Sequence, residues 1–177
     1  MIGVRVTPYK EVPFDESPQG LLIFNMVYRE YEIKQLSEKF YLDYSQLKFP
    51  EILHKEDRPY VVFVIKINDN TFAVPFRTNI THKQSYRFRN TNKQTNSNTG
   101  LDFSKAVIVN KEEYFGNKTN IDNAEYIELE NKIKFIKQKF TVYINNYIKY
   151  VKSNNNKMIE MKYKYSAIQY FNKELGI

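Results

Sequence analysis

The segment AVPFRTNITHK, residues 73–83, changes from apolar side chains to hydrogen-bonding and cationic ones. Its polar half contains Arg77, Thr78 and His82. An arginine can bind phosphate oxygens and stabilise developing charge, and a histidine can accept or donate a proton near neutral pH. Because RNA carries its own nucleophile in the 2′-hydroxyl, side chains of these types could cleave RNA without a metal ion. The alternative is a strand that reaches the surface beside a solvated histidine.

A second cation is expected to meet this segment. Residues 59–67, PYVVFVIKI, are β-branched and aromatic, as in a buried strand, and a second strand follows a short turn at 71–76. In an antiparallel hairpin the start of one strand lies beside the end of the other, so Arg58 and Arg77 are expected to be neighbours. The competing interpretation is that Arg77 forms a structural ion pair with Asp102.

Residues 77–105 are basic and contain aromatic residues. They carry six lysines or arginines and one acid, with Tyr86, Phe88 and Phe103 among them, and the whole chain has a net charge of +7. Single-stranded nucleic acid is bound by this combination, because cations hold phosphates and rings stack on bases. A solvated basic face beside core aromatics would have the same composition.

The pattern along the chain predicts an α+β fold with an antiparallel sheet, because strands come first and a long helix follows. Strands are expected at residues 28–34, 59–67, 71–76, 86–90 and 102–109. A helix is expected at 37–47, and a longer one after Asp122, where apolar residues recur every three or four positions. A short amphipathic helix is expected at 165–177, and loops are expected at 91–100 and 110–120.

The composition argues against several kinds of site. The chain has no cysteine, and its two histidines, His54 and His82, lack the spacing of a zinc motif. We therefore expect no metal and no cofactor. No apolar run approaches the roughly 20 residues of a membrane span. We expect a cytoplasmic protein that does not bind membranes.

The length suggests a single domain. Residues 1–25 differ from the rest in having turn-forming and acidic residues. We expect the domain to occupy residues 26–177, with 1–25 either an N-terminal arm or an extension upstream of a natural start at Met26.

Three segments together resemble a known family. RPYVVFVIKINDNTFAVPFRTNITH, GLDFSKAVIV and SAIQYFNKELGI resemble the ToxN/AbiQ superfamily of type III toxin–antitoxin endoribonucleases, and most closely its CptN/TenpN branch. The resemblance covers residues 30–177. It implies a twisted antiparallel sheet flanked by helices, related to the MazF and Kid toxins. It also implies metal-independent cleavage of single-stranded cellular or phage mRNA to a 2′,3′-cyclic phosphate, often in phage defence.

The resemblance also implies a partner and a set of site residues. The partner is a cognate antitoxin RNA, a pseudoknot-like repeat that the toxin cuts from its precursor and that inhibits it within a closed protein–RNA hetero-oligomer. Arg58 matches the family's basic residue at the start of the first strand, and Arg77 and Thr78 match its polar pair. The family's lysine after that pair is replaced here by Ile80, which leaves His82, Arg58 or Lys105 to take its role.

The catalytic residues predicted on this basis are Arg58, Arg77, Thr78, His82 and Lys105. His82 is expected to do the acid–base work, with Lys105 nearby. RNA contacts are predicted for His54, which lies near the position of a family tyrosine, and for Asn79, Lys83, Tyr86, Arg87, Phe88, Arg89, Lys93, Ser104 and Lys118. Two other interpretations remain: a non-catalytic regulator that binds RNA or DNA, and a structural protein whose basic face meets an acidic partner.

Overall fold

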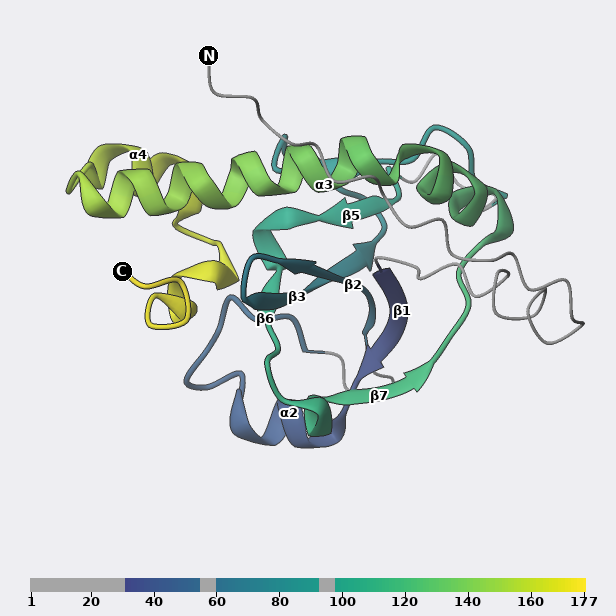
Figure 1. Ribbon diagram of the computed structural model, residues 1–177, viewed down its shortest axis with the longest axis horizontal. Helices are drawn as coiled ribbons and strands as arrows, with labels where there is room; N and C mark the ends of the chain where they lie inside the picture. Colours follow the sequence, from purple (N-terminus) through teal and green to yellow (C-terminus); the bar gives the residue numbers. More distant parts are fainter. Residues whose placement is uncertain (1–30, 55–59, 93–97) are drawn as a thin grey trace, which may run out of the picture.

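The computed structural model describes residues 31–54, 60–92 and 98–177 (Figure 1). In these ranges the chain forms a seven-stranded antiparallel sheet in the order β4-β5-β3-β2-β1-β7, and β6 pairs with β3. The strands are β1 (Tyr31–Leu36), β2 (Val61–Ile67), β3 (Asn70–Arg77), β4 (Ser85–Arg87), β5 (Gly100–Asp102), β6 (Val107–Ile108) and β7 (Phe115–Lys118). The predicted α+β fold with an antiparallel sheet is confirmed. Arg58, Lys93 and the predicted boundary at residue 26 lie outside the described residues.

The predicted hairpin is the centre of the sheet. Strands β2 and β3 pair from Val62 opposite Pro75 to Ile67 opposite Asn70, and Asn68 in the turn has a left-handed φ of 54°. Asparagine tolerates this conformation better than most residues. Four successive residues in each strand are buried, so both faces of the hairpin are covered.

The two faces of the sheet have different neighbours. Phe72 packs on Phe140 of helix α3 (Asn123–Lys152), with ring centroids 5.2 Å apart. Because side chains alternate along a strand, Ala73 points to the other face, where it lines a small cavity with Lys105 and with Tyr41 of helix α2 (Glu38–Asp43). Figure 1 shows α3 and α2 on opposite sides of the sheet.

The two helices begin as predicted. The Ser37 hydroxyl accepts the Phe40 N–H at the start of α2, and the Asp122 carboxylate accepts the N–H groups of Ala124 and Glu125 at the start of α3. These side chains satisfy backbone donors that have no partner within the helix. The predicted apolar stripe of α3 is confirmed by its buried residues Leu129, Ile136, Phe140, Tyr143 and Tyr147.

The prediction of a single strand at residues 102–109 is wrong. Strand β5 ends at Asp102, whose carboxylate accepts the backbone N–H of Ser104 at 3.0 Å. This bond starts a 3-10 helix, η1 (Phe103–Lys105), and extended structure resumes only at β6. An aspartate that bonds to the backbone two residues ahead favours a turn over a strand.

The predictions for the second half also need correction. The loop predicted at 110–120 contains a 3-10 helix, η2 (Glu112–Tyr114), and the edge strand β7, whose sequence FGNK has no β-branched residue. At the C-terminus, the segment predicted to be a helix over 165–177 contains instead a 3-10 helix, η3 (Ala167–Phe171). Helix α4 (Asn156–Tyr163) was not predicted; Asn155 caps it by accepting the Met158 N–H.

Candidate functional site

Asp102 lies at the centre of a polar cluster at the end of β3. Its side chain is fully buried, and its Oδ2 is 2.5 Å from Nη1 of Arg77, whose side chain is 32% exposed. Its Oδ1 accepts hydrogen bonds from the Ser104 hydroxyl at 2.6 Å and the Ser104 backbone N–H at 3.0 Å. The ion pair between Arg77 and Asp102, which was the competing interpretation of Arg77, is therefore present. A buried carboxylate with partners on both oxygens fixes the position of the arginine, which still reaches the surface.

His82 belongs to the same cluster. Its Nε2 lies 3.3 Å from Oδ1 of Asp102, and its side chain is 34% exposed. Its Nδ1 is enclosed and has no hydrogen-bond partner within the described parts of the chain. A histidine that exchanges protons with a substrate must present one nitrogen to it. In this arrangement the ring would have to rotate to do so, because one nitrogen faces Asp102 and the other is enclosed.

Lys105 is a further basic residue near this cluster. Its ammonium donates to the backbone carbonyl of Tyr165 at 2.8 Å, which leaves two of its three donors for other acceptors. Burial lowers the pKa of Lys105, and the positive charge of Arg77 acts in the same direction, while Asp102 and Glu51 oppose the shift. A lysine with a lowered pKa can exchange a proton closer to neutral pH than an exposed lysine can.

Thr78 and Asn79 follow directly after β3 and are exposed. Asn79 has a φ of 57°, a left-handed conformation that turns the chain away from the sheet. The next residue, Ile80, is buried, and its backbone N–H donates to the carbonyl of Asn98. The turn therefore leaves Thr78, the residue that follows Arg77 in the chain, exposed at the surface.

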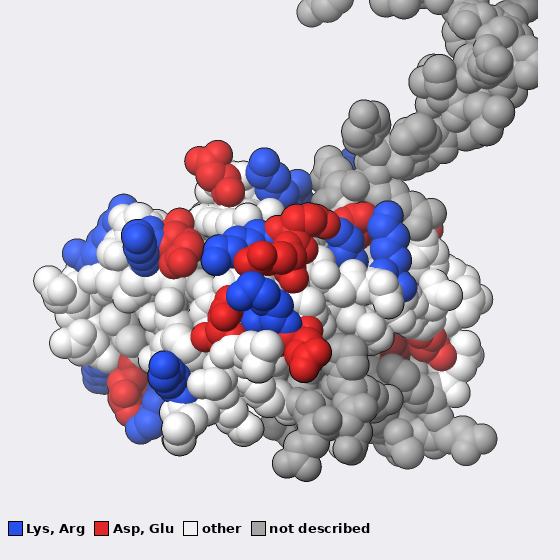
Figure 2. All heavy atoms as spheres, turned by 90° about the horizontal axis from the view of Figure 1, so that it is seen from below, with Lys and Arg blue, Asp and Glu red and all other residues white. Residues whose placement is uncertain are grey.

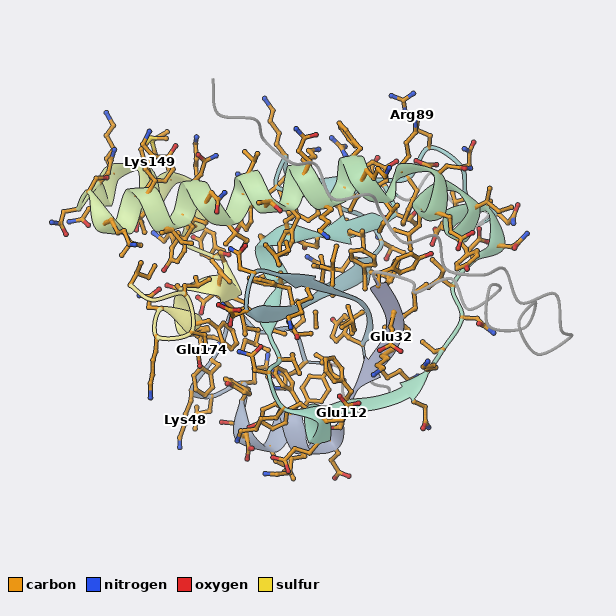
Figure 3. The ribbon with its side chains drawn as sticks, viewed as in Figure 1. Glu32, Lys48, Arg89, Glu112, Lys149 and Glu174 are labelled. Carbon is orange, nitrogen blue, oxygen red and sulfur yellow. The ribbon has the colours of Figure 1, made fainter. Side chains whose placement is uncertain are left out.

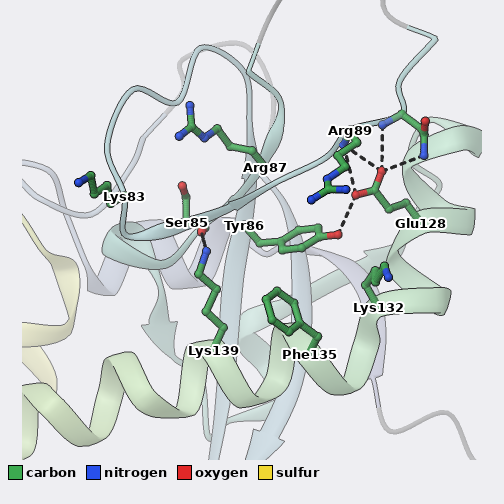
Figure 4. Close-up of a pocket in the computed structure, with 10 residues that line it drawn as sticks. Lys83, Ser85, Tyr86, Arg87, Arg89, Glu128, Lys132, Phe135 and Lys139 are labelled. Atoms are coloured by element: carbon green, nitrogen blue, oxygen red, sulfur yellow. Dashed lines mark hydrogen bonds between the residues drawn. The ribbon is translucent and has the colours of Figure 1, made fainter.

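A groove of about 900 Å³ lies between β4 and α3 (Figure 4). It is lined by Lys83, Ser85, Tyr86, Arg87, Arg89, Asn90, Glu128, Lys132, Phe135 and Lys139. The groove and the Asp102 cluster are joined through the turn before β4, because the Ser85 hydroxyl donates to the backbone carbonyl of His82 at 3.0 Å. Five of the lining residues are cations.

Four of the predicted RNA contacts line this groove, namely Lys83, Tyr86, Arg87 and Arg89. Their accessibility differs. The arginines and Lys83 are exposed, whereas Tyr86 and Phe88 are each only 8% exposed and pack edge to face, with centroids 5.6 Å apart. Neither of these two rings offers a free face for a base in this structure.

The other predicted contacts lie elsewhere. His54 has Nδ1 3.0 Å from the carbonyl oxygen of Ile52, and its ring packs on Tyr41. Its Nε2 is enclosed and meets no hydrogen-bond partner among the residues that the structure describes. Ser104 binds Asp102, as described above.

Lys118 is on β7, where its ammonium lies 2.9 Å from Glu32. Figure 3 shows Glu32 and Arg89 on different sides of the molecule. Figure 2, seen from the side of α2, shows acidic and basic side chains interspersed. The structure therefore does not bring Lys118 to the groove.

Sequence reasoning missed two parts of this region. The sequence indicates Asp102 only as an ion-pair partner of Arg77, although it is the single acid in a basic segment. Phe135 lies outside the apolar stripe of α3, and its exposure of 54% is visible only in the fold. An apolar residue outside the stripe of a long amphipathic helix is the signal that could have identified it.

No group of three or more histidine, aspartate or glutamate side chains gathers at one point among the residues that the structure describes. In the same ranges, no helix combines the length and apolar character that crossing a membrane requires. A scan against protein-family models, a search of curated proteins and a search of solved structures each gave no match to this chain.

Proposed function

We propose that this protein is an endoribonuclease and acts as the toxin of a type III toxin–antitoxin system. The support comes mainly from the arrangement around Asp102, a buried carboxylate that holds Arg77 and lies beside His82, with Lys105 in electrostatic range. The resemblance of the sequence to ToxN/AbiQ toxins supports single-stranded RNA as the substrate. The basic groove beside the cluster is consistent with such a substrate.

The proposed reaction is transesterification by the RNA itself. The 2′-hydroxyl loses its proton to a base, its oxygen forms a bond to the adjacent phosphorus, and the bond from phosphorus to the 5′-oxygen breaks. The leaving oxygen takes up a proton. The products are a 2′,3′-cyclic phosphate and a 5′-hydroxyl, and no external nucleophile or redox partner is needed.

Arg77 is the proposed electrostatic stabiliser. One of its nitrogens is used by Asp102, and the exposed part of the guanidinium retains donors for a phosphate oxygen. The charge on those oxygens increases in the transition state, where a prepositioned donor contributes most. Thr78, the exposed residue that follows Arg77 in the chain, would orient the 2′-hydroxyl or a phosphate oxygen.

Lys105 is the proposed proton-transfer residue, with His82 as the second candidate. Lys105 has free donors and a pKa lowered by burial. His82 would need to rotate its ring, since Nδ1 is enclosed and Nε2 lies against Asp102. Lys105 therefore fits the role that the family's lysine has, although it comes from η1 rather than from the segment after β3.

The toxin role adds a second RNA ligand. A pseudoknot-like antitoxin RNA would bind the same cationic surface and exclude the substrate, in a closed protein–RNA assembly. Such an inhibitor would compete with substrate for Arg77 and for the groove.

The test is incubation of single-stranded RNA with the protein in EDTA, followed by analysis of the RNA ends. We expect cleavage with 2′,3′-cyclic phosphate ends by the wild type. Cleavage should be lost in Lys105→Met and reduced in Arg77→Lys. Lys66→Met is the matched control, because Lys66 is an exposed lysine at the opposite end of the hairpin. RNA that stays intact with well-folded wild-type protein would refute the endoribonuclease proposal.

A non-catalytic RNA-binding regulator is the second candidate. The enclosed Nδ1 of His82 favours it, because this nitrogen cannot reach a substrate in the present arrangement. The same incubation separates the two functions, since a regulator would retard RNA in a gel and leave it intact.

A further inference from the structure

The groove between β4 and α3 has an uneven charge. Among the residues that the structure describes, its cations are Lys83, Arg87, Arg89, Lys132 and Lys139, and Glu128 is its one carboxylate. Charges of both signs are interspersed on the α2 side of the molecule, as Figure 2 shows. The charge of the groove is thus a local feature, and it is complementary to a polyanion.

Glu128 offsets only part of this charge, because the groove has more cations than this one carboxylate, and protein donors bind both of its oxygens. It accepts hydrogen bonds from the Tyr86 hydroxyl at 2.7 Å and from the backbone N–H groups of Arg89 and Asn90, each at 2.9 Å (Figure 4). These bonds tie the chain after β4 to α3. Both walls of the groove are therefore held in place before a ligand arrives, which reduces the entropy lost on binding.

Phe135 is an apolar ring at the floor of this cationic groove. Its side chain is 54% exposed, and Figure 4 shows it between Lys132 and Lys139, which are three residues before and four residues after it on α3. Its ring meets the buried ring of Tyr86, with centroids 6.2 Å apart and planes at 67°. The ring of Tyr86 packs against one side of Phe135, while the exposed part of Phe135 faces the groove.

A flat aromatic face between ammonium groups suits one kind of ligand. An unpaired base can stack on the ring while the flanking phosphates lie near the lysines. A duplex presents no free base face, and an acidic peptide gains little from an exposed phenyl ring. The ligand chemistry is therefore that of a single-stranded nucleic acid.

We propose that this groove binds single-stranded RNA with one base stacked on Phe135 and the adjacent phosphates at Lys132, Lys139 and Arg87. The choice of RNA over DNA rests on the proposed endoribonuclease function. The bond from Ser85 to the carbonyl of His82 joins the groove to the Asp102 cluster. The groove thus holds nucleotides beyond the one that is cleaved, and Phe135 determines affinity rather than chemistry.

The test uses a single-stranded RNA with 2′-O-methyl groups at every position, which cannot be cleaved through its 2′-oxygens. Its affinity is measured by fluorescence anisotropy at several salt concentrations. Phe135→Ala should weaken binding about tenfold, the loss expected when one stacked base is removed. Phe135→Tyr should retain the affinity. Phe135→Leu, which keeps an apolar side chain but has no ring face, should lose it.

Val142→Ala is the matched control, because Val142 is an exposed apolar residue of α3, 52% exposed, that does not line the groove. It should leave the affinity unchanged. Lys132→Met should reduce the slope of log affinity against log salt by about 0.7, the amount for one phosphate contact with a single strand, while Phe135→Ala should leave the slope unchanged.

The proposal is overturned if Phe135→Ala and Phe135→Leu bind as the wild type does, or if duplex RNA or heparin shows the same dependence on Phe135. A failure of the proposed function would look different. In that case unmodified RNA would remain intact, while the methylated strand would still bind in a manner that depends on Phe135.

Discussion

Nη1 of Arg77 lies 2.5 Å from Oδ2 of Asp102, and the carboxylate is fully buried while the arginine side chain is 32% exposed. The pair therefore connects the interior of the sheet to its surface. If the Arg77 side chain moved away, the buried carboxylate of Asp102 would lose its charged partner. This explains why the guanidinium has a fixed position although it reaches the surface. A fixed cation is what stabilisation of a phosphate in the transition state requires.

Replacing Asp102 should cost both stability and activity. Asp102→Asn leaves an amide that can accept only on one oxygen, so Arg77 loses its charged partner and Ser104 loses part of its anchor. Breaking a buried pair costs about 3–5 kcal/mol, and the exposure of Arg77 reduces this to about 2 kcal/mol of unfolding free energy. Urea denaturation would measure it, with Asp69→Asn in the exposed hairpin turn as the control. Equal stability of Asp102→Asn and the wild type would contradict the anchoring role.

Lys105→Met should raise stability at neutral pH while it abolishes cleavage. Burial lowers the pKa of Lys105 from its ordinary value of 10.5, so the folded chain holds this proton less tightly than the unfolded chain. The folded state is penalised below the lowered pKa, and the penalty fades as the pH rises from there to 10.5. The stability gained by the variant should therefore shrink as the pH approaches 10.5.

The pH dependence of cleavage provides a separate check on Lys105. If Lys105 accepts the proton of the 2′-hydroxyl, the cleavage rate should rise with pH up to the lowered pKa and then level off. Lys105→Arg keeps the positive charge but cannot titrate in this range, so it should lose this rise. A rising limb that persists in Lys105→Arg would assign the proton transfer to another group.

Gly100→Ala should disrupt the edge of the sheet beside the groove. A Cβ at this position would lie 2.0 Å from the backbone oxygen of Tyr86 and 2.8 Å from the Cα of Arg87. Both are backbone atoms of β4, so β4 and β5 would have to separate. We expect a loss of about 3 kcal/mol of unfolding free energy. Gly116→Ala is the control, because its nearest contact would be an ordinary 3.5 Å. A similar small effect of both substitutions would refute the close packing of β4 on β5.

Glu128→Gln should weaken RNA binding, although it removes a negative charge from the groove. The amide cannot accept from Tyr86, Arg89 and Asn90 together, so the chain after β4 should detach from α3. Faster hydrogen exchange at the Arg89 and Asn90 amides would report this directly. Glu160→Gln, on the exposed face of α4, is the control. Tighter binding by Glu128→Gln would show that its charge matters more than its position.

The sequence was most informative where one physical signal dominated. The β2–β3 hairpin follows from two apolar runs around a turn, and α3 follows from a regular apolar stripe after the capping Asp122. Strand β7 could not be predicted, because FGNK has no intrinsic preference for extended structure and is held by pairing with β1. Its structure depends on neighbours that are distant in the sequence.

The same limit applies to the site. Arg77 and His82 were identified from their chemistry and Lys105 from the resemblance. The fold places Arg77 and His82 against Asp102, with Lys105 in electrostatic range. The burial of individual side chains could not be predicted from the sequence, and burial determines which aromatic rings a base can reach. Tyr86 and Phe88 are enclosed, whereas Phe135 is exposed because it lies off the stripe that α3 buries. The pattern of residues indicated a basic aromatic surface but not which ring is free.

The most direct test of the account is cleavage of an RNA in which only the nucleotide on the 5′ side of a mapped cleavage site is changed to 2′-deoxy. The incubation is done in EDTA with the unmodified RNA in parallel. Because the account assigns the attack to that 2′-oxygen, it predicts that the deoxy substrate stays intact at this position and still binds. Cleavage there at the unmodified rate would contradict the account, since the nucleophile would then have to come from water or from the protein.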